Sequence, residues 1–158
     1  MGMRDSALTE VENIYFTASD TPDAQSALRR MVELYGQSSL QDADIIVCLG
    51  GDGFMLQTIH DAMLSHLPIY GMNKGTVGFL MNSYAEENLH QRLAGAHVTA
   101  INPLTMRARD EAGHSYSAMA INEVSLLRQS FQAARLDILV DGFLRMEGLG
   151  CDGIMVAT

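Results

Sequence analysis

Four residues that follow an apolar run could bind phosphate and carry acid–base chemistry. They are Gly50-Gly51-Asp52-Gly53, between the run Asp44–Leu49 and a helical pattern that continues to about residue 66. Glycine lets the backbone approach a ligand closely, and N–H groups at the start of a helix favour anions. A carboxylate here repels phosphate unless it takes a proton from a hydroxyl group or works with a metal ion. Asp52 is therefore a candidate general base or metal partner in phosphoryl transfer; a tight turn with Asp52 as helix N-cap is the open alternative.

A second glycine-bearing loop follows the apolar segment Pro68–Met72. Residues 71–80 have the sequence GMNKGTVGFL, and they lie beside the first loop if the two preceding strands are neighbours. Phe79 could stack on a base, but a residue of this type alone favours core filling. Neither loop has the Walker spacing or the dinucleotide-binding G-x-G-x-x-G spacing, so neither of these nucleotide sites is predicted.

Two further polar motifs lie later in the chain. Asn122-Glu123 interrupts an apolar stretch, and adjacent strand residues point to opposite faces. Burying a carboxylate without partners costs free energy, so an ordinary core strand is not expected here. The pair indicates either an edge strand or bulge, or a cleft in which it binds a base edge and ribose hydroxyls. Gly150-Cys151-Asp152-Gly153 is typical of an ordinary turn.

The elements that would position these loops change in type near residue 97. Before it, apolar strands alternate with helical periodicity, which predicts an open, Rossmann-like α/β domain over residues 1–96. After it, short alternating segments predict a β-rich second domain over residues 97–158, incomplete in this chain. The expected strands are 13–19, 44–49, 68–72, 98–109, 115–128, 135–140, 143–147 and 154–157, and the expected helices begin at Pro22, after Gly53 and at Ala85. Asp141-Gly142 predicts a hairpin turn.

The composition excludes several classes of function. The 158 residues carry a net charge of −9, and Lys74 is the only lysine, which excludes a row of cations for nucleic acid. No apolar stretch is long enough for a membrane span, and the N-terminus lacks a signal-peptide pattern, so we expect a cytoplasmic protein without membrane partners. Cys48 lies in an apolar run and is predicted to be buried. No zinc-ligand spacing is present, and we assign no metal ligand.

Taken together and in order, the four motifs resemble the NAD kinase family. They are GGDG at 50–53, GxNxGxxGFL at 71–80, NE at 122–123 and DG at 152–153, and the resemblance runs from about residue 10 to the end. GGDG alone is weak, because diacylglycerol-kinase-type lipid kinases and phosphofructokinases resemble it there. The ordered set is specific.

The resemblance implies an activity and its site residues. Members transfer a phosphoryl group from ATP, or in some cases polyphosphate, with a divalent metal such as Mg²⁺, to the 2′-hydroxyl of the adenosine ribose of NAD. Asp52 is then the base, and Phe79 lines the adenine pocket. Members form dimers or tetramers. The implied phosphate loop is Gly50, Gly51 and Gly53. The implied NAD contacts are Gly53, Asn73, Phe79, Asn122, Glu123 (the last two to the adenosine) and Asp152 (to the nicotinamide ribose, often across a subunit interface).

This sequence departs from the family pattern at two places. Phe54 stands where many members have Thr or Ser, and the chain stops at Thr158, where a Thr-Pro-Thr-Gly-Ser-Thr-Ala-Tyr-like segment would begin. We therefore expect a fragment that is potentially inactive alone and self-associates through exposed strand edges. The alternatives are a non-catalytic NAD-binding module and a lipid or other small-molecule kinase of the same superfamily.

Overall fold

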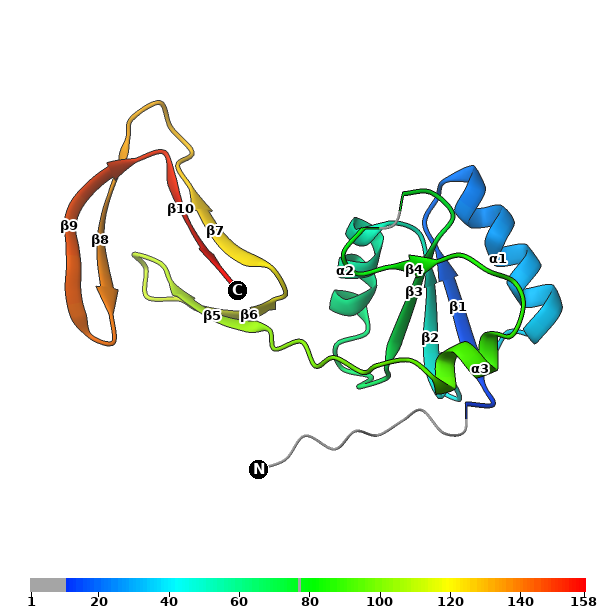
Figure 1. Cartoon of the computed structure of the whole chain (residues 1–158). Coiled ribbons are helices and arrows are strands. Elements are labelled where there is room, and N and C mark those ends of the chain that lie inside the picture. Colours follow the sequence, from blue (N-terminus) through cyan, green and yellow to red (C-terminus); the bar gives the residue numbers. More distant parts are fainter. Residues whose placement is uncertain (1–10, 77) are drawn as a thin grey trace. The chain divides into compact units, whose positions relative to one another are not determined.

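The computed structural model divides the chain into two units, Met1–Ala100 and Ile101–Thr158 (Figure 1). It describes residues 11–76 and 78–158. The N-terminal segment in which we found no signal-peptide pattern, and Val77 of the second glycine loop, lie outside the described residues.

The first unit is a parallel sheet with helices, which confirms the α/β class. Its strand order is β1-β2-β3-β4, and every described pairing is parallel. The strands are β1 (Ile14–Ala18), β2 (Ile45–Leu49), β3 (Ile69–Asn73) and the short β4 (Asn82–Ser83), and the helices are α1 (Pro22–Tyr35), α2 (Asp52–Asp61) and α3 (Leu89–Ala94). Because β2 and β3 are neighbours, the two glycine loops begin at the same edge of the sheet.

Local signals account for the ends of α1. Pro22 stands in the first turn, and the hydroxyl of Thr21 accepts a hydrogen bond from the N–H of Ala24 at 3.4 Å. Gly36 ends the helix with a φ of +77°, a conformation that favours glycine. The two other helices differ from expectation. α2 ends at Asp61, so Met63 lies beyond it, and α3 starts after Asn88, whose φ is +55°.

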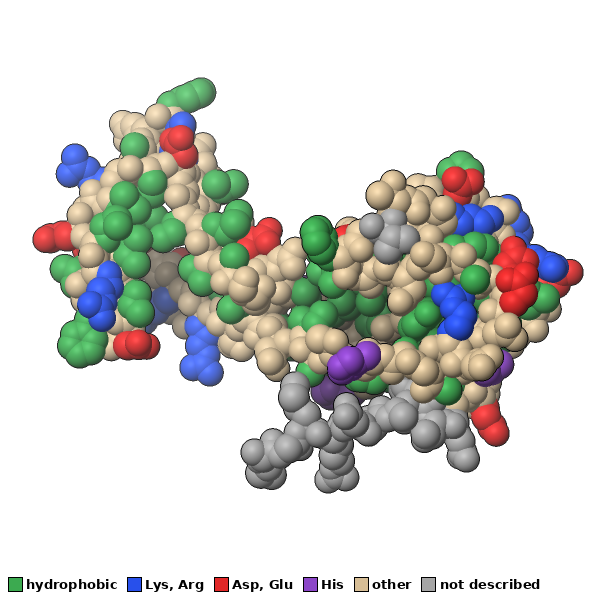
Figure 2. All heavy atoms as spheres, viewed as in Figure 1, with side chains coloured by type: hydrophobic (Ala, Val, Ile, Leu, Met, Phe, Trp, Pro, Cys, Tyr) green, Lys and Arg blue, Asp and Glu red, His purple; other side chains and the backbone are tan. Residues whose placement is uncertain are grey.

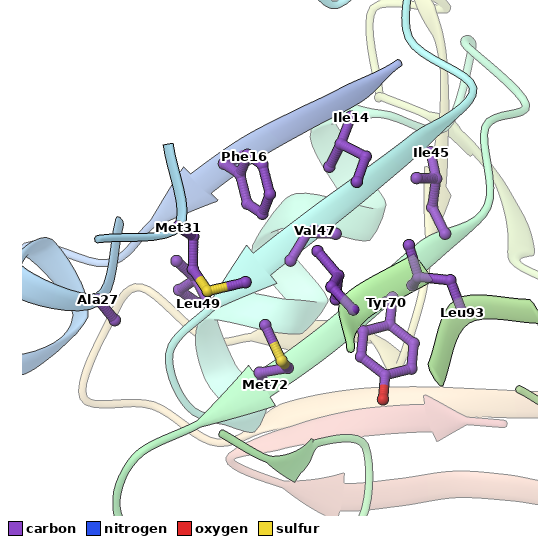
Figure 3. Close-up of a cluster of buried hydrophobic side chains, with 11 residues drawn as sticks. Ile14, Phe16, Ala27, Met31, Ile45, Val47, Leu49, Tyr70, Met72 and Leu93 are labelled. Carbon is purple, nitrogen blue, oxygen red and sulfur yellow. The ribbon is translucent and has the colours of Figure 1, made fainter. Parts of the chain in front are cut away.

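Alternate residues of the strands fill a separate core on each face of the sheet. Figure 3 shows one core, in which Phe16, Val47 and Met72 lie beside Met31 of α1 and Leu93 of α3. On the other face, Cys48 packs with Met55 of α2 and with Met81. Both faces of β2 are thus covered, which explains its continuous apolar sequence.

The second unit consists of paired antiparallel strands. The pairs are β5 (Leu104–Arg109) with β6 (Ser115–Ala120), β7 (Glu123–Leu127) with β10 (Gly153–Ala157), and β8 (Ala134–Val140) with β9 (Phe143–Cys151). Asp141 and Gly142 both have positive φ, which confirms the predicted hairpin turn. The predicted strand 115–128 is wrong, because a bend at residues 121–122 divides it. The strand predicted from Val98 begins only after Pro103, which lacks an N–H group for a ladder.

No residue of the second unit is fully buried. Figure 2 shows hydrophobic side chains gathered on its surface, and Leu127, Phe143 and Met155 are each more than half exposed. Two-stranded ribbons of this kind are marginally stable alone. Within the described residues, no helix has both the length and the apolar character needed to cross a bilayer.

Candidate active site at the carboxyl ends of the parallel strands

The first glycine loop joins the end of β2 to the start of α2. At Gly50, a β-carbon would lie 3.1 Å from Phe54 and 3.2 Å from the hydroxyl of Ser19, so the tight packing of the loop favours glycine. Gly51 and Gly53 have open space where side chains would be. None of these three glycines has a positive φ, so the loop uses their small size rather than a left-handed backbone.

Asp52 links the two glycine loops. Its Oδ2 accepts a hydrogen bond from the N–H of Phe79 at 2.9 Å, and its Oδ1 accepts one from the N–H of Leu80 at 3.1 Å. Gly78 packs against the same carboxylate, with no room for a β-carbon. The N-cap alternative for Asp52 is wrong, because Gly51 caps α2 and Asp52 is its first residue. The carboxylate is thereby held across the gap between the loops.

The second loop presents Phe79 to solvent. The core-filling interpretation of this side chain is wrong, because it is fully exposed while its backbone N–H is bound to Asp52. An exposed aromatic ring in a loop has a face available for stacking on a base.

Asn73 uses its side chain to shape its own loop. Its amide donates to the carbonyl oxygen of Thr76 at 2.8 Å, and its Oδ1 accepts from the N–H of Gly75 at 3.1 Å. These bonds fold the start of the second loop into a turn. The resemblance implies that Asn73 contacts NAD. In the structure, the side chain of Asn73 makes hydrogen bonds within its own loop.

A cavity of about 230 Å³ lies where β1, β2 and β3 end. The first glycine loop, the second loop and the β1–α1 connection all contribute to its wall. The lining residues are Ser19, Thr21, Asp23, Ala24, Ala27, Leu49, Gly50, Gly51, Met72, Asn73, Lys74, Gly75 and Tyr84. Sequence reasoning missed Ser19, Thr21, Asp23 and Tyr84, although a polar segment directly after the first strand was a usable signal.

Tyr84 belongs to a polar network beside this cavity. Its hydroxyl donates to Glu86 at 3.2 Å, and Glu86 accepts from Arg30 of α1 at 2.9 Å. Burial, reinforced by the charge of Glu86, raises the pKa of Tyr84 to about 12, so the phenol stays neutral at physiological pH. The hydrogen bond from Arg30 lowers the pKa of Glu86. Lys74 places its ammonium group 4.9 Å from the centre of the Tyr84 ring, at cation–π distance.

The remaining predicted residues lie in the second unit, on one ribbon. Asn122 lies in the bend before β7, where its carbonyl oxygen accepts from the N–H of Thr158 at 2.9 Å. Glu123 begins β7 and pairs with Ala157. Asp152 precedes β10, and its carboxylate accepts from Arg128 at 2.6 Å. Both residues of the pair are exposed, Asn122 in the bend and Glu123 at the start of β7, so neither side chain enters a core.

Asp152 therefore lies at the opposite end of this ribbon from Asn122 and Glu123. The register pairs Glu123 with Ala157 and Leu127 with Gly153. Four residue steps separate these ends, about 14 Å along a strand. Gly153 is required because a β-carbon would strike the carbonyl oxygen of Leu126.

No group of three or more His, Cys, Asp or Glu side chains suited to a metal ion occurs among residues 11–76 and 78–158. Any divalent cation at the strand ends would meet single carboxylates, such as those of Asp52 and Asp23. Such a cation would take its other ligands from a bound phosphate group or water.

The comparisons with known proteins agree with this geometry. Residues 4–100 match the family model described as the ATP-NAD kinase N-terminal domain. The chain belongs to the NAD kinase family. It is 56% identical over 147 residues to an NAD kinase of Cereibacter sphaeroides, 93% of this chain. It is 51% identical over 156 residues to an NAD kinase of Brucella suis, 99% of this chain.

The match covers only part of these NAD kinases. The chain spans 58% of the length of the Cereibacter relative and 59% of the Brucella relative. The chain is also 50% identical, over 94% of its length, to an NAD kinase of Caulobacter vibrioides. It covers 57% of the length of that relative.

Proposed function

We propose that this chain carries the phosphoryl-transfer site of an NAD kinase, which makes NADP from NAD with ATP or polyphosphate as the donor. The observation that carries the proposal is Asp52, whose carboxylate is held between two glycine loops at the carboxyl edge of a parallel sheet. Ligands bind at such edges in open α/β sheets. The names of relatives that are half identical support the same function.

In the proposed reaction, Asp52 acts as the general base. A carboxylate offers about four lone-pair positions, and the N–H groups of Phe79 and Leu80 use two of them. A free position accepts the proton of the 2′-hydroxyl group. The ribose oxygen then forms a bond to the terminal phosphorus as the bond to the leaving phosphate oxygen breaks, and the donor leaves as ADP or a shortened polyphosphate. General-base assistance of this kind contributes about 10²–10⁴-fold.

The residues proposed to contact the dinucleotide are those that the resemblance to NAD kinases implies. Phe79 offers a stacking face for the adenine, Gly53 leaves space beside Asp52, and Asn73 shapes the loop between them. Asn122 and Glu123 are proposed to contact the adenosine and Asp152 the nicotinamide ribose.

A magnesium ion would neutralise charge on the transferred phosphoryl group when bound. We propose that it arrives with the donor phosphates, because the described residues contribute isolated carboxylates and no three-residue site. We further propose a cytoplasmic homo-oligomer, a dimer or tetramer, for which the exposed apolar surface of the second unit is the support.

NADP formation by the purified chain, supplied with NAD, ATP and Mg²⁺, tests the proposal. Asp52→Asn should lower kcat by at least about 10²-fold with little change in the affinity for NAD. Asp61→Asn, which removes the carboxylate at the other end of α2, is the matched control. Near-normal turnover with Asp52→Asn would exclude the base role.

A non-catalytic NAD-binding module is the second candidate. The observation that favours it is that the chain spans 58% of its Cereibacter relative. NAD binding by calorimetry, without any NADP formed by the wild-type chain, would select this alternative. Failure of both binding and turnover would exclude both functions for this chain.

A further inference from the structure

An arginine and an aspartate are bound to each other at one end of the β7–β10 ribbon. Arg128 directly follows β7, and Asp152 directly precedes β10. The backbone N–H of Arg128 donates to the carbonyl oxygen of Asp152 at 3.0 Å, and its side-chain Nε donates to Oδ1 of Asp152 at 2.6 Å. The same two residues are therefore joined twice, once through the backbone and once through the side chains.

The side chain of Arg128 is itself anchored. Its Nη1 donates to the carbonyl oxygen of Ser130, so two nitrogen atoms of the guanidinium are bound to the protein. The five N–H groups of a guanidinium form a rigid planar fork, and two bonds fix the direction of such a fork. The backbone beside it is fixed as well, because Leu127 pairs with Gly153 in the ribbon. Arg128 is thus a stationary partner for the carboxylate.

This arrangement leaves most of the Asp152 carboxylate accessible. The side chain of Asp152 is 83% exposed, although Arg128 binds its Oδ1. A carboxylate has about four lone-pair positions, and the bond from Arg128 uses one of them. Hydroxyl groups donate to the positions that remain, so the vicinal diol of a ribose suits this carboxylate. An ion pair this exposed contributes little to folding, whereas a fixed carboxylate direction favours the binding of a ligand.

We infer that Arg128 is a positioning residue for NAD, which holds the Asp152 carboxylate toward the hydroxyl groups of the nicotinamide ribose. The inference rests on the proposed function, which assigns Asp152 to that ribose. Arg128 acts in two ways. It fixes the Asp152 side chain before the ligand arrives, so less rotational freedom is lost on binding. Its positive charge also offsets the charge of Asp152, which by itself repels the pyrophosphate of NAD.

A double-mutant cycle on NAD binding tests whether Arg128 acts through Asp152. Calorimetry gives the Kd of NAD for the wild-type chain, Arg128→Ala, Asp152→Ala and the double variant. Arg128→Ala should weaken NAD binding roughly three- to tenfold, the effect expected when one side chain must be ordered on binding. In the Asp152→Ala background the same substitution should have no effect, because the carboxylate that it positions is absent. Arg107→Ala, at an exposed position of β5, is the matched control and should bind NAD as the wild type does.

Two further measurements separate positioning from structural support of the ribbon. AMP lacks the nicotinamide ribose, so Arg128→Ala should bind AMP as tightly as the wild-type chain does. Unfolding of the ribbon would weaken AMP binding too, because Asn122 and Glu123, the proposed adenosine contacts, lie on the same ribbon. Arg128→Lys keeps the positive charge without the rigid fork, so its Kd for NAD should lie between those of the wild type and Arg128→Ala.

Three results would overturn the inference and leave the proposed role of Asp52 standing. The first is an unchanged Kd of NAD in Arg128→Ala. The second is an equal loss with and without the Asp152 carboxylate, which would mean that Arg128 acts independently of Asp152. The third is an equal loss of NAD and AMP affinity, which would assign Arg128 to the stability of the ribbon. A wild-type chain that binds no NAD would instead exclude the proposed function, and this inference with it.

Discussion

Gly78 packs directly against the carboxylate of Asp52. A β-carbon at residue 78 would overlap both carboxylate oxygens, at positions where the N–H groups of Phe79 and Leu80 already hold them. The second glycine loop is therefore shaped around the side chain of the first. Residue 78 must be glycine because of its contact with Asp52, 26 positions earlier in the sequence, and not because of the backbone conformation of the loop.

Replacing Gly78 by alanine should displace the Asp52 carboxylate and lower NADP formation by about 10²-fold, comparable to loss of the base. The loop is exposed, so the unfolding midpoint should change little. Steady-state kinetics and thermal unfolding measure the two effects. Gly95→Ala is the matched control, because a β-carbon there meets only backbone oxygens at 3.4 Å and 4.0 Å. Equal kinetics for the two variants would show that the contact does not position Asp52.

Much of the first unit could be predicted because its signals are local. Pro22 and Gly36 mark the ends of α1, and the unbroken apolar run Ile45–Leu49 marks a strand covered on both faces. The hydrogen bonds of Asp52 could not be predicted, since they depend on which strands are neighbours. The same holds for the cavity residue Tyr84, which comes together with Ser19 only through the sheet.

The second unit shows where periodicity misleads. Residues 115–128 alternate well enough to predict one strand, yet the chain bends at Ile121 and Asn122 and then pairs with β10 instead of β5. The choice of partner strand is a long-range property that alternation does not encode. The roles of Asn122, Glu123 and Asp152 toward NAD stay predictions.

Asp44 should make the stability of the first unit depend on pH. Its carboxylate accepts hydrogen bonds from the N–H groups of Asn13 and Glu12, and these lower the pKa of Asp44 in the folded state. A lowered folded-state pKa adds stability above the unfolded pKa of about 3.9, and this stability is lost as pH falls through the folded-state pKa. Asp44→Asn should therefore lower the Tm at neutral pH, with the difference shrinking below about pH 4.

Thermal unfolding of wild type and Asp44→Asn across this pH range measures the effect. Asp20→Asn, at an exposed position after β1, is the matched control and should leave the profile unchanged. If the Tm difference between Asp44→Asn and wild type did not change with pH, the lost stability would come from altered hydrogen-bond geometry and not from the charge of the carboxylate.

The two cysteines should differ in reactivity. Cys48 is fully buried, its sulfur lies 3.4 Å from the hydroxyl of Thr58, and burial raises the pKa of its thiol. Burial keeps reagents from the sulfur and suppresses the reactive thiolate, and it outweighs the opposite effect of the Thr58 hydroxyl on the pKa. Cys151 is partly exposed at the end of β9. A disulfide reagent should therefore label Cys151 at least about 10²-fold faster than Cys48, and Cys151→Ser should remove the fast phase. A fast phase that survives in this variant would mean that the first unit opens readily.

The β7–β10 ribbon should drive self-association. Val124, Leu126, Ile154 and Val156 form two directly opposed cross-strand pairs on one face of the ribbon. Leu126 and Val156 remain 58% and 57% exposed, so this face is apolar and uncovered within the second unit. Sedimentation velocity of the wild-type chain should give a mass above that of the monomer. The double variant Leu126→Asp with Val156→Asp should shift the distribution toward monomer, because it places charge on both pairs.

Ser125→Asp is the matched control for this prediction. Ser125 lies on the same strand with its side chain on the opposite face, so the added charge does not enter the apolar pairs. Circular dichroism of each variant checks that the strands persist. The core of the first unit is built from other residues and should keep its own unfolding transition. A wild-type chain that sediments as a monomer, or a double variant that associates as strongly as Ser125→Asp, would exclude this face as the contact surface.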